Sequence, residues 1–128
     1  MPYTLSVSRV DRVGVVRLSG ALDGYEIVAA AAALARHPDW RGGYRVVWDT
    51  TRIEALDFAP VHFAALLDQE ARLDAADATG DVVVITRDEV WASLVVLFRA
   101  HVGEGRSVTT VPTAADAEAL LGVALPVG

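Results

Sequence analysis

The chain has 128 residues, enough for one domain with a substantial hydrophobic core and too few for two. Hydrophobic residues make up 53% of it, which excludes a disordered chain, and the formal net charge of −6 argues against binding nucleic acid, whose phosphates need a basic surface. Cysteine is absent and all 11 Lys and Arg positions are arginine, so disulfides, thiolate chemistry, thiolate metal sites and lysine catalysis are excluded.

Uninterrupted apolar runs are short in this sequence. The longest, residues 27–35 and 94–98, fall below the roughly 18 residues that a membrane-spanning helix needs. The first four residues, Met1 to Thr4, form neither a basic nor an apolar segment, so we expect no secretory signal and a cytoplasmic location. No linker, repeat or low-complexity segment divides the chain, and a single domain over residues 1–128 is expected.

The first two predicted elements form a hairpin. Residues 3–10 alternate between apolar and hydroxyl side chains, a period of two that predicts a half-exposed strand. After a short connection, residues 13–18 are its antiparallel partner. Asp23 and Glu26 then have the spacing of a capping box, which predicts a helix over residues 24–37.

A short apolar run at residues 44–48 follows and predicts a central strand that leads into a polar loop at residues 49–52. Asp57 is placed to cap a second helix that runs to about Ala76, with Pro60 tolerated in its first turn. Gly80 is expected to close that helix.

The last third of the chain alternates strand and helix. Residues 81–86 are typical of a buried strand, and Thr86 with Glu89 suggests a capping box for a third helix that ends at Gly103. A last strand over residues 107–111 precedes a short helix that begins at Thr113 and ends at Gly122. The third helix carries an apolar stripe of Val90, Trp91, Leu94, Val95, Phe98 and Val102.

The order ββαβαβαβα predicts an α/β fold, with about five strands in a single mixed sheet and helices packed on it. Catalytic and metal motifs are missing from this framework. The histidines lack metal-binding spacing, and we expect His37 and His101 to interact with the ends of their helices. No serine stands in a nucleophile elbow and no glycine-rich dinucleotide loop is present, so no catalytic residue, metal or cofactor is predicted. A hydrolase whose site is assembled only in space is the remaining enzymatic alternative.

Asp49 follows a central strand, the position of the phospho-accepting aspartate in response-regulator receivers. Those receivers also use a lysine, which this chain lacks, and the favoured interpretation is that Asp49 caps a turn with the threonines after it. Among the tryptophans, Trp48 and Trp91 are assigned to the core or its rim. Trp40 is the one of the three with the better chance of partial exposure, which could make it an anchor for a partner, but a ring folded back over the sheet edge is the favoured interpretation.

Residues 15–23, Val-Val-Arg-Leu-Ser-Gly-Ala-Leu-Asp, resemble the second strand and the first-helix entry of STAS domains, the family of bacterial anti-sigma-factor antagonists. In that family a strand ends in a Leu-Ser-Gly-x-Leu-Asp pattern and leads into the first helix. Gly20 would allow a sharp exit from the strand, and Asp23 would cap the helix. The other predicted elements follow in a similar order, so the resemblance covers nearly the whole chain and implies a STAS-like fold.

The family's switch is a serine in an Asp-Ser-Ser-Gly motif at the start of the second helix, phosphorylated by a kinase-type partner. The corresponding stretch here is Asp57-Phe58-Ala59-Pro60, if the preceding loop has one extra residue, and it has no hydroxyl. The resemblance therefore implies a non-catalytic interaction domain that lacks the phosphorylatable serine. Its implied partner is a protein of the kinase-type anti-sigma-factor class.

We expect this partner to contact the start of the second helix and the loop before it, with an aromatic anchor and acidic groups that orient the complex. The residues predicted for this surface are Trp48, Asp49, Thr50, Thr51, Glu54, Asp57 and Phe58.

A divergent STAS/SEC14-like branch of this fold also lacks the serine, and it implies an alternative: binding of a small apolar or lipid-like ligand. Trp91 and Phe98 would line such a pocket, although the same spacing fits a plain core. Homo-oligomers are a further expectation, because they would cover the edge hairpin and the apolar tail at residues 123–127.

Overall fold

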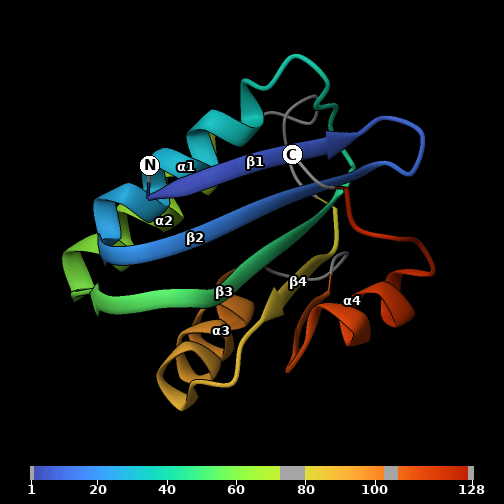
Figure 1. The fold of residues 1–128 in the computed structure, drawn as a ribbon. Helices are drawn as coiled ribbons and strands as arrows, with labels where there is room; N and C mark the ends of the chain where they lie inside the picture. Colours follow the sequence, from blue (N-terminus) through green and yellow to red (C-terminus); the bar gives the residue numbers. More distant parts are fainter. Residues whose placement is uncertain (1, 73–79, 103–106, 127–128) are drawn as a thin grey trace.

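One mixed sheet of five strands forms the centre of the molecule (Figure 1). The structure is a computed structural model, and it describes residues 2–72, 80–102 and 107–126. The strands lie in the order β1-β2-β3-β4-β5; β1 is antiparallel to β2, and the other neighbouring pairs are parallel. Their bounds are β1 Tyr3–Ser8, β2 Val13–Asp23, β3 Arg45–Asp57, β4 Val82–Ile85 and β5 Val108–Val111. The predicted mixed sheet and the opening hairpin are confirmed.

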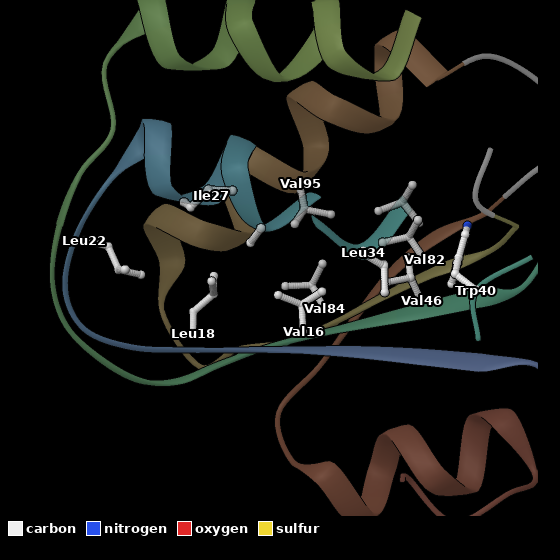
Figure 2. Packing of buried hydrophobic residues seen from close by; sticks show 12 residues of the cluster. Val16, Leu18, Leu22, Ile27, Leu34, Trp40, Val46, Val82, Val84 and Val95 are labelled. Atoms are coloured by element: carbon white, nitrogen blue, oxygen red, sulfur yellow. The ribbon is translucent and has the colours of Figure 1, made fainter. Parts of the chain in front are cut away.

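Four helices complete the predicted order ββαβαβαβα: α1 Gly24–Ala35, α2 Pro60–Arg72, α3 Glu89–Val102 and α4 Ala114–Leu121. Figure 2 shows α1, α2 and α3 above the sheet and α4 below it. Each of the first three helices joins two parallel strands, as a crossover connection requires. Within the described parts of the chain, none of these helices is long and apolar enough to cross a lipid bilayer.

Local signals in the sequence set the starts of two helices. Asp23 accepts a hydrogen bond from the Glu26 N–H at 3.1 Å and donates its own N–H to the Glu26 carboxylate at 3.0 Å, which completes the predicted capping box. Thr113 accepts from the Asp116 N–H at 3.1 Å, and α4 ends at Gly122 in the left-handed region with φ 74°. These caps satisfy backbone groups that the helix itself leaves unpaired.

Two hydrophobic clusters cover the two faces of the sheet. Successive residues of a strand point to opposite faces, so neighbouring valines of the central strands divide between the clusters. The cluster under α1 and α3 is drawn in Figure 2 and includes Val16, Leu18, Leu22, Ile27, Leu34, Trp40, Val46, Val82, Val84 and Val95. The cluster on the α4 side consists of Val13, Val15, Val47, Val83, Ile85, Ala117 and Leu121. Because both faces are covered there, β4 and residues 46–48 of β3 read as continuous apolar runs.

Two strands are longer than predicted. β2 continues past Leu18 to Asp23, so the expectation that Gly20 ends the strand is wrong. Gly20 has φ 78° and lies where the register between β2 and β3 shifts. Its left-handed backbone conformation therefore accommodates an irregularity in the pairing of these two strands. β3 continues through residues 49–57, although 49–52 were predicted as a loop. Pairing with β2 holds these polar residues in a strand.

The second helix also begins differently. Asp57 is the last residue of β3 and not a cap; α2 begins at Pro60, where the missing N–H of proline costs nothing. The side chain of His62 instead accepts a hydrogen bond from the Ala59 N–H at 2.8 Å, through Nδ1. The predicted end of this helix near Ala76 lies outside the described residues.

Three smaller expectations are also corrected. Trp40 is only 4% exposed and lies beside Tyr44, so the favoured folded-back ring is confirmed, but Trp40 is less exposed than Trp48 and Trp91 and not more. His37 lies beyond α1, and its Nδ1 accepts a hydrogen bond from the Asp39 N–H at 3.1 Å, so the ring interacts with the following turn and not with the last turn of the helix. Thr86 is no helix cap either: α3 begins at Glu89, and the Thr86 hydroxyl accepts the Asp88 N–H. The side chain of His101 and residue Gly103 lie outside the described part.

The described part of the apolar tail, residues 123–126, packs against its own chain. Val123 and Leu125 lie against the α4-side cluster, the Leu125 N–H donates to Glu118 at 2.9 Å, and the Pro126 carbonyl accepts from Arg17 at 2.6 Å. Residues 123–126 are therefore covered in part within one chain, and homo-oligomerisation stays a prediction.

Candidate functional site

The distal half of β3 is a free sheet edge in the described part of the chain. β4 pairs only with residues 46–49 of β3, whereas β2 pairs with β3 as far as Asp57. Figure 1 shows β3 running on past the point where β4 turns away toward α3. From Thr50 to Asp57, β3 has β2 on one side and no strand on the other among the described residues.

Asp49 and Thr50 stabilise the point where the strands diverge. The Asp49 carboxylate accepts from the backbone N–H of Thr51 at 3.0 Å and from its hydroxyl at 2.6 Å, where the register of β3 on β2 shifts. The predicted turn-capping role of Asp49 is confirmed, although the turn is a bulge within a strand. The Thr50 hydroxyl is buried and donates to the Ile85 carbonyl at 2.7 Å, which satisfies the last carbonyl of β4.

A groove of about 560 Å³ lies between this free edge and the start of α3. Its β3 side is formed by Thr50, Thr51, Ile53, Glu54, Ala55, Leu56 and Phe58, and its other side by Thr86, Arg87, Asp88 and Trp91. These groups come from the carboxyl ends of parallel strands, the common position of binding sites in sheets of this kind.

The charge at this end of the sheet is mainly negative. Glu54 and Asp57 are exposed, and Asp57 is the register partner of Asp23 on β2. Of the two arginines nearby, Arg87 donates its Nε–H to the Pro112 carbonyl at 3.3 Å, and Arg52 is exposed. The groove therefore has an acidic rim, and its lining is partly apolar: Ile53, Leu56 and Trp91, which also pack against the core, form its floor.

The start of α2 is pressed against the start of α1. His62 is 6% exposed, and its ring stacks edge-on to Tyr25 at 4.6 Å and tilted to Phe58 at 5.8 Å between centroids. Gly24 makes this approach possible, because a Cβ there would overlap the Cβ and Cγ of His62. The contact positions Phe58 beside the groove.

A separate apolar cavity of about 90 Å³ lies between the sheet and helices α1, α2 and α3. Trp91 and Phe98, the residues predicted for a ligand pocket, both line it. Phe58 and Trp91 line the groove as well as the cavity, so these two rings contribute to both spaces. Among the described residues that line the cavity, Glu70 is the only charged one.

The structure brings together only part of the predicted partner-binding set. Thr51, Glu54 and Phe58 line the groove, and Asp57 is exposed at the end of the same strand. Thr50 also lines it, but its side chain is buried and internally bonded. Trp48 lines the cavity instead, and the Asp49 carboxylate accepts a hydrogen bond from the Thr51 N–H at the bulge.

Sequence reasoning missed the opposite wall of the groove, made by Thr86, Arg87 and Asp88. No pattern links these residues to β3, because the topology brings together segments that are far apart in the sequence. The β-branched and apolar residues Thr50, Thr51 and Ile53 were the available signal that the strand continues. Among the described residues, no group of three His, Asp or Glu side chains is placed to hold a metal ion.

Three solved structures are similar to this fold over most of their length. The unphosphorylated form of the anti-sigma factor antagonist SpoIIAA superposes with a TM-score of 0.57 at 16% identity, over 94% of this chain and 97% of that one. An anti-sigma factor antagonist from Mycobacterium paratuberculosis gives 0.50 at 23% identity, over 94% of each chain. The phosphorylated form of the Bacillus cell fate determinant SpoIIAA gives 0.52 at 16% identity, over 93% and 98%.

The chain has the fold of the anti-sigma factor antagonists. The likeness expected from residues 15–23 is thus confirmed at the level of the fold. No protein-family model matches the sequence, and no curated protein matches it.

Proposed function

We propose that the chain is a non-catalytic protein-interaction domain whose partner binds at the groove beside the free end of β3. The observation that carries this proposal is the groove itself, an accessible space with the apolar rings of Phe58 and Trp91 and the exposed carboxylate of Glu54. Aromatic groups in a concave surface supply binding energy, and charged rims orient and select partners.

The similar structures suggest the kind of partner. They are anti-sigma factor antagonists, and we infer that this chain binds a kinase-type anti-sigma factor. SpoIIAA is known in unphosphorylated and phosphorylated forms. Here residues 57–60 and the whole of α2 contain no serine or threonine. We therefore propose that phosphorylation at the start of α2 does not regulate this chain, and that its partner is controlled in another way.

Capture of purified kinase-type anti-sigma factors by the immobilised chain tests this proposal. We expect Asp57→Ala combined with Phe58→Ala to weaken capture at least about tenfold, because the anchor and an orienting charge are both removed. Asp57→Ala alone changes an exposed residue and separates a lost contact from a lost fold. Leu120→Ala, which truncates a 54% exposed side chain on α4, is the matched control. Unchanged capture by the double variant would contradict the proposed surface.

A second candidate function is supported by the cavity. An apolar cavity of about 90 Å³ lined by Trp91 and Phe98 is a suitable site for a small apolar ligand. An engineered cavity of roughly 150 Å³ in another protein holds benzene, so the present space fits only a small hydrocarbon group. A whole lipid chain would require α2 or α3 to move away from the sheet.

Native mass spectrometry of freshly purified protein tests this alternative. A reproducible adduct would support it, provided that filling the cavity with Ala31→Leu removes the adduct while Ala29→Leu, on the exposed face of the same helix, leaves it. Bare protein in every preparation would count against it.

A further inference from the structure

The free edge of β3 has the properties of a strand-addition site. An unpaired edge presents backbone N–H and C=O groups that another extended segment can pair with. Residues 51–57 extend for roughly 20 Å at the usual rise of a strand, which is long enough for several ladder hydrogen bonds. We propose that the partner adds an extended, basic segment to this edge as a further strand of the sheet. This inference rests on the proposed function and specifies how the partner binds.

The shape of the groove favours an extended occupant. It follows β3 from Thr50 to Phe58 and is closed on its other side by the start of α3. Side chains of a strand point alternately to the two faces of a sheet, so every second side chain of an added strand reaches the apolar floor near Ile53, Leu56 and Trp91. These three residues are half-buried, so an added strand would remove their remaining apolar surface from water, which favours binding.

The charge of the rim selects a basic segment. Glu54 and Asp57 are exposed on the edge strand itself, and Asp23 is the register partner of Asp57. Two arginines also lie nearby, Arg52 on the same strand and Arg87 on the opposite wall, but with Asp88 the carboxylates outnumber them. Arginine or lysine side chains on the added segment would therefore meet carboxylates, whereas an acidic segment would be repelled.

Charged residues and bulges also protect natural edges from unwanted pairing, and β3 has both. The two roles predict different results with a generic peptide. An edge that is only protected against pairing would bind no added strand. A docking edge would bind an added strand of complementary charge.

The probe is a synthetic peptide of about nine residues in which arginine and valine alternate, long enough to span the edge. Two further peptides have the same side chains, one N-methylated at the odd backbone amides and the other at the even ones. Only one set of amides faces β3 in an added strand. We expect one methylated peptide to bind about 100-fold more weakly than the other, because roughly three hydrogen bonds are lost.

Two measurements locate the binding. Hydrogen exchange should slow at residues 51–57 when the unmodified peptide binds. Glu54→Gln should weaken the affinity several-fold, while Ala119→Arg, which changes the net charge equally on the exposed side of α4, should not. Equal affinities of the two methylated peptides, no protection on β3, or no binding at about 1 mM peptide would each overturn the inference. None of these outcomes depends on anti-sigma-factor capture, so strand addition and the proposed function can fail separately.

Discussion

Replacing Gly24 by alanine should destabilise the protein, although helix propensity alone predicts the opposite. Gly24 is the first residue of α1 and has an ordinary negative φ, so alanine would otherwise stabilise by up to about 1 kcal/mol. A Cβ at this position, however, would overlap the Cβ and Cγ of His62 and lie 2.7 Å from its Nδ1. Overpacking of this kind typically costs about 1–3 kcal/mol. We expect a net loss of about 1–2 kcal/mol.

The prediction is specific because the atom that a Cβ at position 24 would strike is known: it is the Cβ of His62. His62→Ala keeps the Cβ that a methyl group at Gly24 would strike, so the cost of Gly24→Ala should persist in that background. His62→Gly removes the Cβ, and there the cost should fall by at least about 1 kcal/mol in a double-mutant cycle. Each His62 variant also loses the acceptor for the Ala59 N–H, an effect that cancels within its own cycle.

Urea unfolding followed by tryptophan fluorescence measures these differences, with the slope of the transition checked for each variant. Ala29→Gly, on the exposed side of the same helix, gives the cost of propensity without a steric contact, about 0.5–1 kcal/mol. The reasoning is refuted if Gly24→Ala is as stable as the parent, or if both His62 backgrounds relieve it equally.

Three further predictions concern single side chains, each measured by the same unfolding assay. Trp40→Ala should cost about 3–5 kcal/mol, because the ring is 4% exposed and fills the space beside Gly14; a loss below about 1 kcal/mol would mean that the ring is not part of the core. Thr50→Val should cost about 1–2 kcal/mol by leaving the Ile85 carbonyl without its hydroxyl donor, whereas Thr51→Val, on an exposed side chain, should cost less. Asp23→Ala should cost about 1 kcal/mol and Asp23→Asn much less, since asparagine still caps; equal losses would assign the effect to charge.

Part of the candidate site could be predicted from the sequence. The acidic and aromatic residues Glu54, Asp57 and Phe58 were selected because the resemblance implied a partner contact at the start of the second helix, and all three lie at the groove or beside its edge. Trp48 was selected for the same reason, but alternation along β3 directs its ring to the cavity.

The groove itself could not be predicted. It depends on the early end of β4 at Ile85, which leaves the rest of β3 without a neighbour on that side among the described residues. It also depends on Arg87 and Asp88, which belong to a connection with no distinguishing pattern.

By itself, the sequence determined the features that depend on neighbours along the chain. Capping boxes and N-caps involve residues three positions apart, and strand alternation involves residues two apart, so the starts of α1 and α4, the hairpin and the element order were readable. Only the tertiary structure decided how long each strand is and which segments face each other. Residues 49–57 are too polar to predict a strand alone, and they become one because β2 pairs with them. Pairing between distant segments is a property of the assembled sheet, and the binding groove is created by the same pairing.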